Sequence, residues 1–118
     1  MTNVDSNAES PAGRDFYCAQ VLSNRVSVER LDENEYALAF RHTRPVWTQH
    51  IVVIPKRHVE SLVSVDLDEA TLDAVMALVR RIAQHVLAET GGCRVMTNLG
   101  RFQDSKHLHW HIGSGEPV

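Results

Sequence analysis

The chain has 118 residues, of which 43% are hydrophobic and 23% are charged, a balance typical of one globular domain with one core. The net charge of -3 and the scattered basic residues argue against binding to nucleic acid by bulk charge. No stretch is both apolar enough and long enough to span a membrane. We therefore expect neither nucleic acid nor a membrane as a partner. Cys18 and Cys93 form no disulfide framework, and in the absence of a signal peptide we expect a reduced, cytoplasmic setting.

The first elements are short. Residues 1–13 are polar and small, so we expect a disordered tail followed by a single domain over residues 14–118. The pattern predicts a short helix over Asp15–Leu22 and a half-exposed strand over Val26–Arg30. An acidic turn over Asp32–Glu35 is expected to end that strand.

Two strands and a long helix come next. Tyr36–Arg41 and the β-branched run His50–Ile54 are predicted strands, separated by a loop over Thr43–Thr48. Apolar residues at i, i+3 and i+4 spacing predict a helix over Asp68–Thr90. Acidic residues near its start suit the helix dipole, and Gly91 is a natural stop.

The C-terminal part reads as a strand over Cys93–Asn98, a polar loop over Gly100–Lys106 and a final strand over His107–Ile112. The element order is thus a short helix, three strands, a long helix and two strands. This order predicts an α+β fold, with a mostly antiparallel sheet of about five strands and helices on one face.

Three histidines alternate along the last predicted strand. Because successive side chains of a strand point to opposite faces, His107, His109 and His111 share one face. The other face is apolar and can pack under the long helix; it carries Leu108, Trp110 and Ile112. Each imidazole can donate a proton, accept one or attack an electrophile near neutral pH. Alternatively, the three histidines are ordinary polar residues on a solvent-facing strand, or they bind a metal ion.

The row resembles the signature of the histidine triad (HIT) superfamily, His-φ-His-φ-His-φ-φ, where φ is apolar. His107–Ile112 fit this signature, and Gly113 fills its last position as a small residue. His50–His58 is similar to a second block of the family, H-φ-φ-V-I-P-K-x-H. The resemblance spans about Asp15–Ile112 and implies a HIT-like fold.

Enzymes of this family hydrolyse or transfer nucleotides at the α-phosphate, so the resemblance implies a phosphohydrolase or nucleotidyl transferase. His109 would be the nucleophile and form a nucleotidyl-histidine intermediate, while His111 would bind phosphate oxygens. His107 would orient His109, and His50 would extend the polar network. The implied ligand is a nucleotide, or a nucleoside phosphate ester or phosphoramidate.

The resemblance also implies substrate contacts. Asn98 and Gln103 match positions that contact ribose or phosphate. His42 stands where one branch has an acidic residue that holds the ribose hydroxyls, and Asp104 stands where that branch has a serine, with Ser105 next to it. These departures leave open a non-catalytic nucleotide-binding domain as the alternative.

Some relatives bind zinc through Cys-x-x-Cys and two histidines. Here Asp15 replaces the first cysteine, and Asp15, Cys18, His50 and His107 could hold a structural zinc ion, although no cofactor is required for catalysis. A zinc-stabilised HIT domain is therefore a further alternative. Family members are commonly homodimers, so we expect a homodimer.

Four other residues are also of interest. His58 is expected to close a turn, and Cys93 to lie in the core. Trp47 could stack on a base or serve packing, and Lys106 could contact phosphate or point into solvent.

Overall fold

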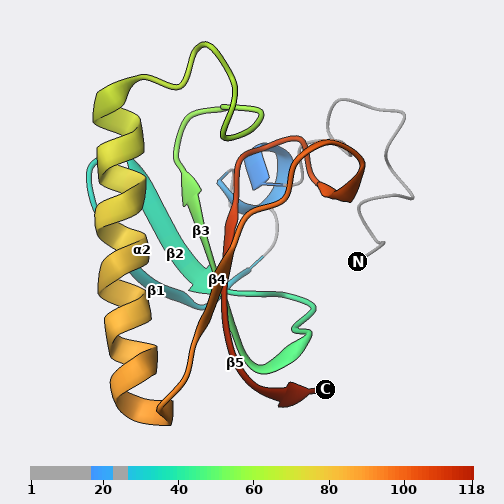
Figure 1. The fold of residues 1–118 in the computed structure, drawn as a ribbon. Coiled ribbons are helices and arrows are strands. Elements are labelled where there is room, and N and C mark those ends of the chain that lie inside the picture. The colour runs from blue at the N-terminus through green and yellow to red at the C-terminus, as the bar shows by residue number, and fades with distance from the viewer. Residues whose placement is uncertain (1–16, 23–26) are drawn as a thin grey trace.

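The computed structural model describes residues 17–22 and 27–118, which form one five-stranded antiparallel sheet with a long helix against one face (Figure 1). The strand order is β1-β2-β3-β5-β4, and the expected α+β fold is confirmed. The elements are β1 (Arg30–Glu33), β2 (Ala37–Arg41), β3 (Trp47–Pro55), α2 (Glu69–Thr90), β4 (Arg94–Met96) and β5 (Trp110–Pro117), with a π-helical turn at Tyr17–Val21 and a 3-10 turn at Gly100–Phe102.

Both faces of the central strands β2 and β3 are buried. Alternate residues point to opposite sides, so each strand supplies two layers of apolar side chains. One layer packs under α2 and contains Ala37, Ala39, Ile51, Val53 and Ile112. The other packs against the π-helical turn and contains Leu38, Phe40, Val52 and Ile54. The sheet is therefore a scaffold with a separate apolar cluster on each face.

The predicted helix is confirmed and begins after the N-cap residue Asp68. The Asp68 carboxylate makes no capping hydrogen bond; it accepts one from Arg57 Nη2 at 2.8 Å. Gly91 ends the helix with φ of +84°, and its N–H donates to Leu87 O at 2.9 Å. Glycine adopts this left-handed conformation at little cost, as the sequence predicted for this position.

The strand predicted over Val26–Arg30 is wrong in its described part, because β1 begins at Arg30 and includes two residues of the expected acidic turn. Their carboxylates are tolerated on this edge strand because cations reach them. Asp32 Oδ2 lies 2.6 Å from Arg81 Nε, and Glu33 Oε2 lies 2.7 Å from Lys56 Nζ. Edge strands accept such charged residues readily.

Two other strand boundaries differ from the prediction. β3 begins at Trp47, inside the expected loop, because Trp47 pairs with Pro117 of β5. β4 covers only three residues of the predicted Cys93–Asn98. In the expected helix Asp15–Leu22, the described part is the π-helical turn Tyr17–Val21.

The last strand also starts later than predicted, at Trp110. His107 and His109 lie before it, because the main chain there pairs with a loop instead of β3: Leu108 N donates to Val59 O at 2.7 Å. Two residues of the expected apolar face, Trp110 and Ile112, pack into the layer under α2, whereas Leu108 is buried outside that layer.

The expected tail over residues 1–13 lies outside the described residues, and so does Asp15. Among the described helices, none combines the length and the apolar character that crossing a bilayer requires.

A close contact explains the small residue after the histidine row. A Cβ atom at Gly113 would lie 2.2 Å from Cε3 of Trp47, far inside van der Waals contact. Glycine therefore lets the Trp47 indole lie flat against β5. That ring also contacts the His50 ring, with the two centroids 4.8 Å apart.

We predict that Gly113→Ala lowers the free energy of unfolding by about 1–3 kcal/mol, because the indole must move away from the strand. Urea unfolding followed by tryptophan fluorescence measures this loss and reports the altered Trp47 environment. Gly92→Ala is the matched control, since a Cβ there meets nothing within 4 Å. Equal unfolding midpoints for the two variants would contradict the prediction.

Candidate functional site

Five buried histidines gather on the side of the sheet opposite α2. His111 on β5 pairs with Val52 on β3, and directly paired residues share a face. His50 lies two residues before Val52 on the same face. Each of these histidines is at most 8% exposed. They are His42, His50, His107, His109 and His111.

Main-chain contacts determine which ring nitrogen of His109 carries hydrogen. Its Nδ1 lies 2.8 Å from the carbonyl oxygen of His107. A carbonyl oxygen only accepts hydrogen bonds, so Nδ1 must be the donor. In the neutral ring the lone pair is then on Nε2, which is the arrangement that a nucleophilic imidazole needs.

A chain of hydrogen bonds gives His111 the opposite tautomer to that of His109. The N–H of Val46 donates to His50 Nδ1 at 2.9 Å, so His50 carries its hydrogen on Nε2. His50 Nε2 lies 2.9 Å from His111 Nδ1 and donates to it. His111 therefore carries its own hydrogen on Nε2. The ring of His111 lies beside that of His109, with centroids 4.9 Å apart.

His42 is held in the same way. The N–H of Arg44 donates to His42 Nδ1 at 2.8 Å, which leaves the hydrogen of the neutral ring on Nε2. The ring lies close to that of His50, tilted by 30° with centroids 4.3 Å apart, and stacks on the ring of His111 with centroids 5.8 Å apart. Within the described chain, His42 Nε2 is buried and has no hydrogen-bond partner.

These three rings stay neutral at physiological pH. Burial, reinforced by the neighbouring histidines, lowers the pKa of His42 to about 3 and that of His111 to about 3. The same effects lower the pKa of His50 to about 4. These three rings can therefore offer neutral N–H donors to a ligand, but no imidazolium charge.

A cavity of about 160 Å³ opens beside the three neutral rings. Of the residues expected to bind substrate, His42, Asn98 and Asp104 line it. Its full lining is His42, Val46, Trp47, His50, Met96, Asn98, Asp104 and His111.

The other two expected substrate residues are buried in the loop before the row. Gln103 Nε2 donates to Glu60 O at 2.6 Å and ties this loop to the segment after β3. Ser105 is fully buried. Lys106 Nζ donates to Gly100 O at 3.0 Å, so its ammonium group braces the loop instead of pointing toward the rings.

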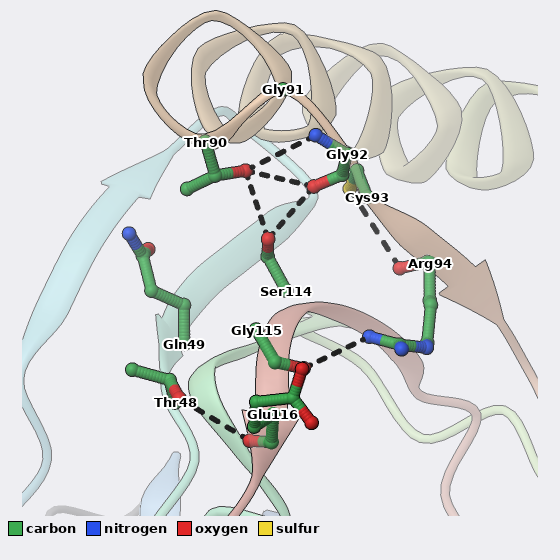
Figure 2. Close-up of a pocket in the computed structure, with 10 residues that line it drawn as sticks. All are labelled: Thr48, Gln49, Thr90, Gly91, Gly92, Cys93, Arg94, Ser114, Gly115 and Glu116. Carbon is green, nitrogen blue, oxygen red and sulfur yellow. Dashed lines mark hydrogen bonds between the residues drawn. The ribbon is translucent and has the colours of Figure 1, made fainter.

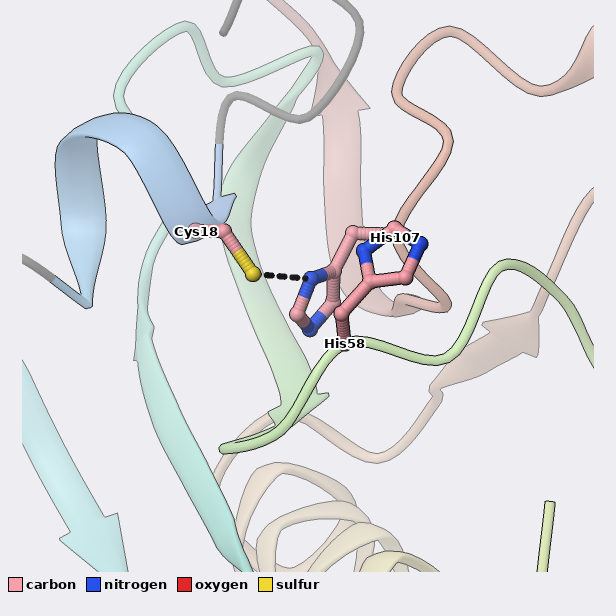
Figure 3. Close-up of side chains that lie close together, drawn as sticks. All are labelled: Cys18, His58 and His107. Carbon is pink, nitrogen blue, oxygen red and sulfur yellow. Dashed lines mark hydrogen bonds between the residues drawn. The ribbon is translucent and has the colours of Figure 1, made fainter. Parts of the chain in front are cut away.

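A second cluster joins Cys18, His58 and His107, each with a donor atom within 4.8 Å of the other two (Figure 3). His107 Nε2 donates to Pro55 O at 2.8 Å, so the Nδ1 lone pair faces Cys18 Sγ, 3.2 Å away. One thiol and two imidazoles are suitable ligands for a metal ion such as zinc. The cluster could therefore hold a metal.

The expected metal set of Asp15, Cys18, His50 and His107 needs correction at one position. Both ring nitrogens of His50 are engaged by Val46 and His111, and His58 occupies the place beside Cys18. The second family block, which ends on His58, carried the signal for this residue. Asp15 lies outside the described residues.

A larger cavity, of about 830 Å³, lies elsewhere, between the end of α2 and strands β3 and β5 (Figure 2). The Ser114 hydroxyl group in this cavity already has partners in the protein. Its Oγ lies 2.8 Å from Thr90 Oγ1 and 2.8 Å from the carbonyl oxygen of Gly92. Burial raises the pKa of its Cys93 thiol, which keeps that group protonated and a poor nucleophile. The smaller cavity, in contrast, is lined by three of the five buried histidines, His42, His50 and His111.

Several known proteins are similar to this chain in sequence and in fold. Residues 26–118 match the HIT domain family. A HIT-like protein of Chlamydia pneumoniae is 32% identical, over 84% of this chain and 92% of its own. A hypothetical histidine triad nucleotide-binding protein from Sulfolobus tokodaii is similar in structure, with a TM-score of 0.76, 28% identity and coverage of 86% and 68% of the two chains.

A HIT family hydrolase from Legionella pneumophila is also similar, with a TM-score of 0.73 and 26% identity over 86% of this chain and 93% of that one. The family match spans most of the sequence and includes His107, His109 and His111. The protein therefore belongs to the HIT domain family.

Proposed function

We propose that the protein is a hydrolase or nucleotidyl transferase that cleaves nucleoside phosphates at the α-phosphorus through His109. The observation that carries this proposal is the hydrogen bond from His109 Nδ1 to His107 O, which leaves a lone pair on Nε2. Similarity to a HIT family hydrolase and to a histidine triad nucleotide-binding protein supports the reaction and the ligand.

In the proposed first step the His109 Nε2 lone pair attacks phosphorus. The bond from phosphorus to the leaving group breaks, and that group departs with the bonding electrons. A nucleotidyl-histidine remains. Water then hydrolyses it, or another acceptor receives the nucleotidyl group, and His109 is regenerated. The Nε2–H of His111 donates to a phosphate oxygen and stabilises the charge that develops there. His50 holds His111 in that orientation.

We further infer that the metal at Cys18, His58 and His107 is a structural zinc ion. The thiol and the His107 lone pair already face one another at 3.2 Å, and Asp15 is the expected fourth ligand. Bound there, zinc would join the π-helical turn to the loop after β3 and to the histidine row. No step of the proposed chemistry uses the ion.

The edge of the sheet suggests a homodimer. β4 is the last strand in the sheet order, and all its residues are exposed. Val95 and Met96 are 44% and 37% exposed, which is unusual for apolar residues on an unpaired edge. Pairing with the same strand of a second copy would cover both.

We predict that His109→Ala lowers kcat at least about 1000-fold, because the nucleophile is lost. Turnover is measured on nucleoside 5′-phosphoramidates and dinucleoside polyphosphates with each common base, and intact mass detects the nucleotidyl adduct. His85→Ala, on the exposed side of α2, is the control and should keep full activity. Unchanged turnover in His109→Ala would refute the proposal. Binding without any turnover in the parent protein would identify a non-catalytic nucleotide-binding domain.

We predict about one zinc ion per chain in the untagged protein, measured by elemental analysis. Cys18→Ser should lose the ion and lower the melting temperature, whereas Cys93→Ser, outside the cluster, should retain zinc. If the parent protein has no stoichiometric zinc, or if Cys18→Ser keeps it, the metal site is wrong.

We predict that stability falls between pH 7 and pH 5, because unfolded histidines take up protons near pH 6.5 while the folded rings do not. Because the folded pKa values are about 3 to 4, the loss of stability begins near pH 6.5 and continues as the pH falls. Each ring contributes up to about 1.4 kcal/mol per pH unit. Urea unfolding measures the slope, which should be smaller for His42→Phe; identical slopes would contradict the role of His42.

We predict a dimeric mass in sedimentation equilibrium and a monomeric mass for Val95→Glu, since a carboxylate on β4 would be buried at the interface. Val63→Glu is the matched control, because Val63 is also exposed but lies in the loop before α2. A monomeric parent protein would refute the dimer.

A further inference from the structure

A cavity of about 330 Å³ lies under the second half of α2, between the helix and strands β1, β2 and β3. Its apolar residues come from three of these elements: Leu31 on β1, Ile51 on β3 and Ile82 on α2. Pockets that bind small molecules measure about 300–1000 Å³. The cavity is therefore large enough for a small organic molecule, and it offers that molecule an apolar surface.

This cavity lies on the opposite face of the sheet from the buried histidines. Arg41, which lines it, is paired with Ile51, and directly paired residues share a face. Ile51 packs under α2. His50 precedes Ile51 on β3, and its side chain points to the other face because successive side chains of a strand alternate. Among the described residues, none lines both this cavity and the histidine-lined one.

Two arginines at this cavity have hydrogen-bond donors that the described protein does not use. Arg41 Nε lies 3.2 Å from Glu29 Oε2. Arg81 Nε lies 2.6 Å from Asp32 Oδ2. A guanidinium group also carries N–H bonds on both Nη atoms. Within the described parts of the chain, the Nη atoms of Arg41 and Arg81 have no hydrogen-bond or ion-pair partner. Each arginine therefore keeps the end that binds a pair of oxygen atoms.

The carboxylates at the same cavity already have partners. Asp32 Oδ1 accepts a hydrogen bond from the N–H of Glu33 at 2.8 Å, and its Oδ2 faces Arg81. Glu89 Oε2 lies 3.4 Å from His85 Nε2. The cavity thus has more unused donors than unused acceptors. A ligand that matches it has to bring acceptor oxygens, and a carboxylate matches the planar end of an arginine best.

We propose that this cavity is a second ligand site, which binds a small organic acid with an apolar body. The apolar body covers Leu31, Ile51 and Ile82, which removes apolar surface from water. The carboxylate of the ligand accepts charge-assisted hydrogen bonds from the Nη groups of Arg41 and Arg81. This inference goes beyond the proposed function and does not depend on it, because the two cavities are on opposite faces of the sheet.

The test uses naphthalene-2-carboxylate as the probe and naphthalene-2-carboxamide, its uncharged counterpart, as the control ligand. In calorimetric titration the carboxylate should bind at one site with a dissociation constant of about 1 mM or lower, the range expected for a ligand of this size. The carboxamide should bind about tenfold more weakly, because the charge-assisted bonds are lost. A carboxylate that does not saturate the protein, or a carboxamide that binds equally well, would overturn the inference.

Substitutions then test the two arginines. Arg41→Gln and Arg81→Gln should each weaken carboxylate binding about three- to tenfold and change carboxamide binding less than about twofold. Arg80→Gln is the matched control, since Arg80 is exposed on α2 but does not line the cavity. Glu89→Gln removes a negative charge from the cavity and should strengthen carboxylate binding.

Melting temperatures report whether each variant folds. Arg81→Gln also loses the ion pair with Asp32, whereas Arg41→Gln leaves that pair intact, so the second variant tests the site even if the first is unstable. Equal losses of affinity in Arg41→Gln and Arg80→Gln would show attraction by overall charge only and would contradict the site.

The position of the probe is measured separately. In 1H–15N spectra, naphthalene-2-carboxylate should move the main-chain signal of Ile82 and leave those of His109 and His111 in place. Shifts at the two histidines alone would put the probe in the histidine-lined cavity and overturn the inference. A parent protein without turnover or nucleotidyl adduct contradicts the proposed function, but it leaves this second site unaffected, because none of these measurements uses activity.

Discussion

The chemistry of the site depends on hydrogen bonds between main-chain groups and imidazole rings. The carbonyl of His107 fixes hydrogen on Nδ1 of His109, whereas the amides of Arg44 and Val46 fix it on Nε2 of His42 and His50. Rings of the same residue type thus present a lone pair in one place, as the proposed nucleophile requires, and N–H donors in another. Burial lowers the pKa of His42 to about 3 and that of His50 to about 4, so these two rings keep their neutral tautomers at physiological pH.

The sheet supports this arrangement because it is packed on both faces. On β5, Trp110 and Ile112 pack under α2, while His111 between them points to the opposite face. The apolar layer anchors the strand, and the anchored strand positions the donor ring. Gly113 continues the strand without a side chain and leaves room for the Trp47 indole, which contacts His50. Packing on one face therefore sets the geometry of the other.

Periodic patterns predicted the main elements well. The apolar stripe and Gly91 placed α2 to within one residue, and alternation correctly put Trp110 and Ile112 under it. The start of β5 escaped prediction, because the partner of the preceding segment is the Val59 carbonyl in a loop without periodicity. The choice of His58 instead of His50 beside Cys18 likewise depends on how the chain turns after β3. The tautomers depend on loop amides, which no side-chain pattern encodes.

His107 has two roles that use different atoms. Its ring lies between Pro55 O and Cys18 Sγ, and its carbonyl oxygen holds the ring of His109. The Cys18 cluster and the ring proposed as the nucleophile are thus connected through one residue. A displacement of the His107 backbone would move both the carbonyl that holds the His109 ring and the imidazole that faces Cys18. The position of the π-helical turn and the orientation of the proposed attacking nitrogen are therefore coupled.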